Sequence, residues 1–193
     1  AVNGVINIVT RRASETHGTL ASVGTGTVDQ GAATIRYGAG TDTGLDYRVY
    51  AKGFAPGSQY HPDGADFDAN GWMSETGFRA DWNKGAGQSF VLQGDLSKGR
   101  HGQRVQATSV TPPSLTTLDG MADTSGGNLT ALWERRRDGG QLRVEAYYDR
   151  TAWRAPHFEE TRHTIDVDYM QRSAPHGRQR VNWGAGIRWS PGT

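Results

Sequence analysis

Residues 72–82 read WMSETGFRADW, and apolar and polar side chains alternate along this stretch. Several positions on one side of an extended chain are apolar, namely Trp72, Phe78, Ala80 and Trp82. Positions on the other side carry charge, namely Glu75, Arg79 and Asp81. A period of two is that of a β-strand, which presents successive side chains to opposite faces of its sheet. The stretch therefore predicts a strand with one apolar and one hydrated face.

The same alternation recurs along residues 44–54, 141–149, 163–171 and 180–189, whereas no window carries an apolar stripe at helical spacing. Glycine, present 27 times, interrupts almost every helical candidate. We predict one strand within residues 1–12 and about nine further strands. Their expected ranges are 18–27, 31–39, 44–55, 71–83, 87–99, 127–137, 140–154, 160–172 and 177–190. The predicted fold is all-β, an antiparallel up-and-down meander.

Composition limits the classes of protein to consider. The 193-residue chain is 35% hydrophobic, has a formal net charge of +1 and contains no cysteine. The balanced charge gives no electrostatic reason to expect a nucleic-acid partner, and the lack of cysteine excludes disulfides and thiolate metal sites. The sequence contains no run of about 18 apolar residues, so no membrane-spanning helix is predicted. A strand of a transmembrane barrel, however, needs only about ten alternating residues.

The predicted connections alternate in length. Every second connection is a tight turn, and two of the others are long, at Pro56–Asn70 and Arg100–Gly126. Outer-membrane barrels sort their connections in this way, with short turns on the periplasmic side and longer loops outside. The pattern favours an incomplete transmembrane β-barrel whose two long loops face outward.

The tryptophans fit the edges of a membrane. Trp72 and Trp82 lie ten positions apart on one face, which corresponds to roughly 23 Å along the membrane normal for a strand tilted by about 45°. We expect the six tryptophans to form membrane-interface girdles, namely Trp72, Trp82, Trp133, Trp153, Trp183 and Trp189. The alternative is that they cap the core of a soluble sandwich. The inward-facing charges would line an aqueous lumen or contact a polar plug, namely Arg48, Glu75, Arg79, Asp81, Glu145, Asp166 and Asp168.

The opening residues AVNGVINIVTRR resemble the last strand of the plug domain of TonB-dependent outer-membrane receptors. The following stretch GTLASVGTGTVDQGAATIRYGAG is similar to the first barrel hairpin of that family. The resemblance implies a barrel of about 22 strands, of which about nine are present here. It divides the chain into the end of the plug at 1–12, a linker at 13–17 and part of the barrel at 18–193. The signal peptide, the energy-coupling box and most of the plug are expected to lie outside this sequence.

The resemblance implies a function in active import. The family takes up ligands such as ferric siderophores across the outer membrane of Gram-negative bacteria, driven through the TonB energy-coupling system. The implied partners are outer-membrane lipid, TonB through the missing N-terminal part, and a ferric chelate or other small ligand. No enzymatic activity and no cofactor are expected, since no G-x-S-x-G motif occurs and the six histidines are scattered.

Candidate binding residues cluster in the first long loop. Tyr60, His61 and Phe67 have aromatic or polar side chains of the kind that bind a chelate or a glycan. The same loop carries a weak candidate cation site, namely Asp63, Asp66 and Asp68, which lacks the spacing of an EF-hand. The alternative in both cases is an ordinary solvated loop. Glycine pairs such as Gly38 and Gly40 are expected to let the plug approach the barrel wall closely.

Two other classes of function stay open at this stage. The chain could form a small self-contained outer-membrane β-barrel, acting as an adhesin or a pore. It could also be a soluble carbohydrate-binding β-sandwich, in which the tryptophans would pack between two sheets. If the resemblance holds, we expect these strands alone neither to insert stably nor to transport, because open sheet edges do not occur in lipid.

Overall fold

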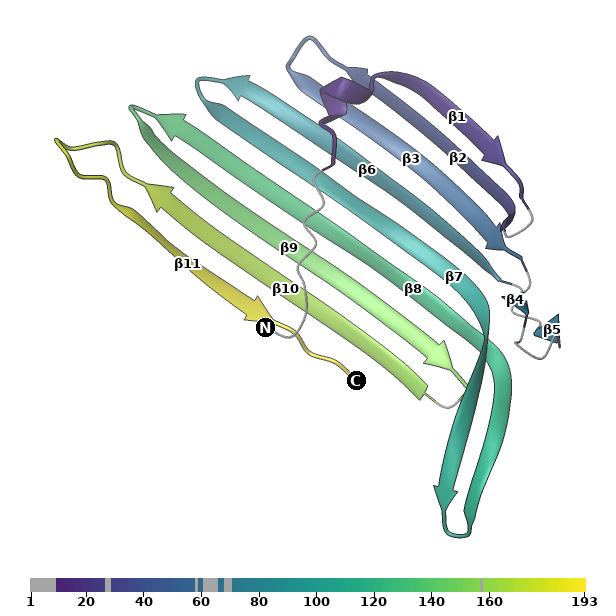
Figure 1. The fold of residues 1–193 in the computed structure, drawn as a ribbon. Coiled ribbons are helices and arrows are strands. Elements are labelled where there is room, and N and C mark those ends of the chain that lie inside the picture. Colours follow the sequence, from purple (N-terminus) through teal and green to yellow (C-terminus); the bar gives the residue numbers. More distant parts are fainter. Residues whose placement is uncertain (1–9, 27–28, 58, 61–65, 68–70, 157) are drawn as a thin grey trace.

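The computed structural model describes residues 10–26, 29–57, 59–60, 66–67, 71–156 and 158–193. Nine strands form one antiparallel sheet, side by side in chain order (Figure 1). They are β1 (Gly18–Gly24), β2 (Asp29–Gly40), β3 (Leu45–Pro56), β6 (Trp72–Gly85), β7 (Gln88–Val110), β8 (Pro113–Arg137), β9 (Gly140–Ala155), β10 (Phe158–Arg172) and β11 (Asn182–Trp189). A second sheet pairs β4 (Gln59–Tyr60) with β5 (Asp66–Phe67). A 3₁₀-helix, η1 (Ala13–Thr16), precedes β1.

The all-β, up-and-down architecture predicted from the alternation is confirmed. Each of the nine predicted ranges after residue 17 overlaps one strand of the large sheet. The strand predicted within residues 1–12 lies mostly outside the described residues, and residues 10–12 are not in a strand. The expected linker at 13–17 contains η1. In the described ranges η1 is the one helical element, and no helix there has the length and hydropathy needed to span a membrane.

The second long loop was predicted wrongly. Residues 100–126 do not form a loop but extend β7 and β8 into one long hairpin, paired without a break from Gln88↔Arg135 to Val110↔Pro113 (Figure 1). Proline, serine and threonine in this stretch are typical of loops, but only Thr111 and Pro112 are needed for the turn. Arg104 and Asp119 connect the two strands of the hairpin, since Arg104 Nη2 donates a hydrogen bond to Asp119 Oδ2 at 2.9 Å.

Two other connections differ from the sequence prediction. The first long loop contains the short hairpin β4–β5. The strand predicted at 177–190 begins only at Asn182, and Gly177 has a left-handed φ of 59° in the connection before it. A left-handed residue interrupts strand pairing, and glycine adopts it at little cost. This connection is longer than the tight turn expected there.

Strand register separates the side chains into two faces. Seven charged residues share one face through their cross-strand pairing, namely Arg48, Glu75, Arg79, Asp81, Glu145, Asp166 and Asp168. We call this the charged face and its opposite the apolar face. On the apolar face, Trp82 lies opposite both Leu45 and Phe90, and Phe90 lies opposite Trp133. The predicted separation of apolar from charged positions is therefore confirmed strand by strand.

The sheet has no hydrophobic core of its own in the described part of the chain. Only two apolar residues there are buried, Ala13 and Ala122, and no large side chain is fully buried. Large side chains of the apolar face stay exposed, for example Trp72 at 44% and Ile187 at 71%. Exposed apolar surface of this extent is typical of an interaction surface.

The tryptophans do not all lie on one face. Five lie on the apolar face, namely Trp72, Trp82, Trp133, Trp183 and Trp189. Trp153 instead lies opposite Thr124 and Glu160 on the charged face. Placing Trp153 in a membrane girdle was therefore a mistake, because a side chain on the charged face points away from the apolar band. Trp189 pairs with Ile165, which in turn pairs with Tyr148, so the three residues share one row of the apolar face.

The large sheet is not closed within the described residues, and β1 and β11 form its edges. An unpaired backbone group in lipid costs several kcal/mol. We therefore expect a polypeptide limited to these 193 residues to remain outside the bilayer when mixed with lipid vesicles. Gel mobility before and after boiling measures this. A detergent-stable monomer that shifts on heating would contradict the expectation.

Candidate functional site

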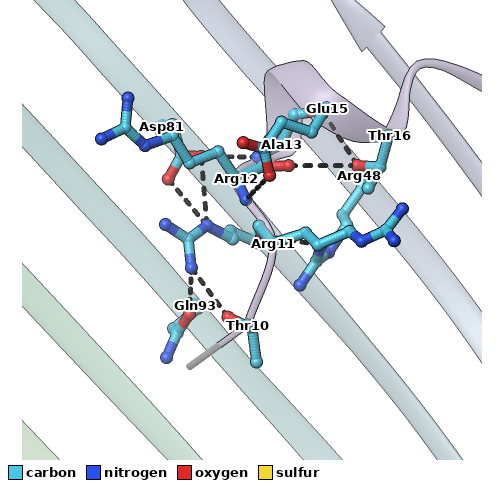
Figure 2. A network of polar contacts seen from close by, with 10 residues as sticks. Thr10, Arg11, Arg12, Ala13, Glu15, Thr16, Arg48, Asp81 and Gln93 are labelled. Carbon is cyan, nitrogen blue, oxygen red and sulfur yellow. Dashed lines mark hydrogen bonds and ion pairs between the residues drawn. The ribbon is translucent and has the colours of Figure 1, made fainter. Parts of the chain in front are cut away.

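The N-terminal segment, residues 10–17, lies on the charged face (Figure 2). Asp81 of β6 accepts a hydrogen bond from the backbone N–H of Ala13 at 2.6 Å. Arg48 of β3 donates to the carbonyl oxygen of Arg11 at 2.9 Å, and Arg79 donates to Thr10 Oγ1 at 2.9 Å. Three strand side chains thus hold backbone and side-chain groups of one short segment.

Asp81 is the centre of this contact. Its side chain is only 11% exposed, and Arg79 Nε donates to its Oδ1 at 2.8 Å while being 14% exposed itself. Arg79 also donates to Gln93 Oε1 at 3.1 Å. A buried carboxylate is tolerated when charge and hydrogen bonds compensate its lost hydration. Here the compensation comes from a neighbour on the same strand and from the N-terminal segment.

The helix η1 comes close to the sheet because β2 offers glycine beneath it. A Cβ at position 38 would overlap the carbonyl oxygen of Thr16, and a Cβ at position 40 would lie 3.0 Å from His17 Cε1. Thr16 is 2% exposed. Gly38 and Gly40 thus permit a close approach, but by Thr16 and His17 of the predicted linker rather than by the predicted plug residues.

Replacing Gly38→Ala is expected to loosen the N-terminal segment, because the new methyl group and the Thr16 carbonyl cannot share the same space. Overpacking of this kind costs about 1–3 kcal/mol, which corresponds to about 5- to 150-fold faster tryptic cleavage after Arg11 and Arg12. Gly31→Ala is the matched control, since it lies on the same strand with nothing within 4 Å of a new Cβ. Equal cleavage of the two variants would argue against the contact.

A polar row crosses four strands next to this segment. Tyr50 Oη lies 2.6 Å from both Glu75 Oε1 and Asp95 Oδ1, and donates its single proton to one of them at a time. Lys52 Nζ lies 3.0 Å from Glu75, and Asn128 Nδ2 donates to Asp95 Oδ2 at 2.7 Å. These contacts link β3, β6, β7 and β8, and they give the carboxylates of Glu75 and Asp95 hydrogen-bond or ion-pair partners.

A pocket of about 280 Å³ lies nearer the other end of the charged face. Trp153 and Met73 line it together with Glu160 and Arg162, which are joined at 2.6 Å. The Trp153 ring meets His101 edge to face, with ring centroids 5.8 Å apart. An aromatic wall beside a carboxylate and a guanidinium suits a small ligand with both apolar and charged parts.

The sequence prediction missed this pocket. Trp153 was assigned to the membrane edge from its position near a strand end. The period of two along the strand was the available signal. Trp153 lies an even number of positions from the acidic residues at 145 and 149, so it shares their face.

The predicted binding residues of the first long loop are only partly described. The backbones of Tyr60 and Phe67 lie on facing strands of the β4–β5 hairpin, where Tyr60 pairs with Asp66 and Gln59 with Phe67. His61, Asp63 and Asp68 lie outside the described residues. Across the described ranges no three potential His, Cys, Asp or Glu ligands gather in one place. The predicted loop cation site therefore stays a prediction.

Comparisons of the chain with family models, with curated proteins and with solved structures found no match. The function of the chain is therefore inferred from the two faces of the sheet and from the segment that lies on one of them.

Proposed function

We propose that this chain is part of a TonB-dependent outer-membrane receptor, comprising the end of its plug and about nine strands of its barrel. The observation that carries the proposal is the location of residues 10–17 against the charged face while the opposite face is apolar and uncovered. A large transmembrane barrel requires this division, with lipid outside and a polar plug inside.

The contact of residues 10–17 with the charged face also supports a large size for the proposed barrel. The interior of an eight-stranded barrel is just wide enough for its own side chains. Residues 10–17 add a segment of backbone, including a helix, on the inward side of β2, β3 and β6. A small self-contained pore has no room for such a segment, so a wide barrel is favoured.

A soluble sandwich is less favoured for a different reason. A sandwich buries one face of each sheet against a second sheet. In the described part of the chain the second sheet consists of two strands of two residues each, which cannot cover nine strands. The apolar face is instead proposed to contact the acyl chains of the outer membrane.

In this arrangement the charged face lines the lumen and the pocket at Trp153 is open to an entering ligand. A ferric siderophore combines apolar or aromatic arms with charge, which suits an aromatic wall beside Glu160 and Arg162. Import would be driven through TonB by the N-terminal part of the receptor.

Extending the reading frame in both directions tests the proposal. We expect a plug domain with an energy-coupling segment upstream of Ala1, and further alternating strands downstream of Thr193. Deleting the gene should then abolish TonB-dependent uptake of one ferric chelate. A signal peptide that directly precedes Ala1, or a frame that continues as a soluble enzyme, would refute it.

A further inference from the structure

Basic side chains gather on the apolar face at the end that carries the long connections. The cross-strand row that runs from β6 to β10 there has four charged members beside Trp72, namely Arg100, Asp123, Arg154 and Glu159. Within it, Arg154 lies 2.7 Å from Glu159 and Arg100 lies 3.6 Å from Asp123. This outermost row thus balances its own charge.

Two further cations lie between this row and the apolar band. Lys98 of β7 pairs with Ser125, one row closer to the band, and Arg150 of β9 pairs with Gly127, one row closer again. Neither has a carboxylate partner among the residues the structure describes. Arg150 adjoins the band directly, since the next row contains Tyr148, Leu129 and Phe78.

The strand between the two cations, β8, carries small residues there, and the Leu96 side chain of β7 lies over Gly127. Ser125 and Gly127 of β8 are small, and Arg150 reaches across toward Ser125, with Nη1 donating to its Oγ at 3.5 Å. Lys98 approaches from the other side and is exposed. We call Lys98, Ser125 and Arg150 the basic patch. It presents a guanidinium, an ammonium and a hydroxyl on adjacent strands, donor groups suited to phosphate.

We propose that the basic patch binds the phosphate of an anionic lipid headgroup in the leaflet at the long-connection end. The inference rests on the proposed function, because it needs the apolar face to contact lipid. The choice of a lipid over free phosphate follows from continuity, since the patch adjoins an apolar band that acyl chains would cover. A lipid presents its phosphate and its chains in this order along the membrane normal.

The proposal is tested by comparing how strongly two brominated lipids quench the fluorescence of Trp72. Trp72 of β6 lies opposite Arg100. Ser74, two residues further along β6, lies opposite Lys98. The receptor from the complete reading frame, with its other tryptophans changed to phenylalanine, is placed in phosphatidylcholine vesicles containing brominated phosphatidic acid or brominated phosphatidylcholine. We expect Trp72 to be quenched with about fivefold selectivity for phosphatidic acid, and less at high salt.

The double variant Lys98→Gln with Arg150→Gln should lose this selectivity, whereas Lys98→Arg with Arg150→Lys should keep it. Lys84→Gln is the matched control, because Lys84 lies at the opposite end of β6 with its Nζ 4.7 Å from the Trp82 ring centroid. Equal quenching by both lipids in the unaltered protein would overturn the proposal, as would selectivity that survives in the double glutamine variant. Inorganic phosphate should reduce the selectivity no more than sodium chloride at equal ionic strength; a clearly larger loss would assign the patch to the free anion and overturn the proposal too.

The same experiment separates this proposal from the proposed function. If brominated phosphatidylcholine quenches Trp72 but phosphatidic acid has no advantage, only the basic patch fails. If neither lipid quenches any tryptophan of the apolar face in the receptor that keeps all its tryptophans, the apolar face does not contact the membrane and both proposals fail.

Discussion

Asp81→Ala is expected to release the N-terminal segment from the charged face. The change removes the acceptor of the Ala13 N–H and leaves the half-buried network of Arg79 without its carboxylate. Breaking a buried ion pair by removing one partner costs about 3–5 kcal/mol, which corresponds to at least about 100-fold more frequent opening. Amide hydrogen exchange at Glu15 and Thr16 measures the opening in the detergent-solubilised receptor.

Asp46→Ala is the matched control for this experiment. Asp46 lies on the same face and contacts the same segment through His17 at 2.8 Å, but its side chain and that of His17 are 23% and 46% exposed. A polar contact with this exposure contributes at most about 1 kcal/mol, so exchange should rise only a few-fold. If the two variants open equally, the buried carboxylate is not what holds the segment.

If the apolar face contacts lipid as proposed, Ala146→Arg is expected to disrupt membrane insertion. Ala146 lies opposite Ala131 and Val167 in the middle of the apolar face. Arginine on the lipid face near the middle of the bilayer costs about 2–4 kcal/mol. Urea unfolding of the receptor in lipid vesicles should therefore show a loss of this size in the free energy of unfolding.

Thr130→Arg introduces the same side chain one step away on the other face. Thr130 lies opposite Gln93 and Tyr147 on the charged face, where water and polar groups solvate a guanidinium. We expect a change below about 1 kcal/mol. A soluble protein with a solvated outer face would tolerate both variants, and a sandwich packed through the charged face would reject Thr130→Arg instead.

Much of the sheet could be predicted because one apolar and one polar face impose a period of two on each strand. The alternation at Leu142, Val144 and Ala146 fixes both a strand and its faces. The constraint weakens beyond the apolar band, where neither face needs to be apolar. The extension of β7 and β8 past Arg100 therefore carries no alternating signal, and its turn at Thr111 and Pro112 lies in a loop-like composition.

The candidate site was harder to predict than the sheet. The contact between Ala13 and Asp81 joins residues 68 positions apart, and no local pattern links them. Glycine at position 38 was a partial signal, because a strand residue without a side chain often marks a close approach. The network around Tyr50 depends on register across three neighbouring strands, which single-strand alternation does not fix.

Spin-label accessibility along β9 tests most directly whether the two faces contact lipid and water. The chain has no cysteine, so single cysteines at each of residues 143–149 can be labelled without background. In vesicles, positions 144, 146 and 148 should be accessible to oxygen, and positions 143, 145, 147 and 149 to a water-soluble nickel chelate. If the nickel chelate reaches all seven positions equally, or if neither reagent reaches 144, 146 and 148, the apolar face does not lie in a membrane.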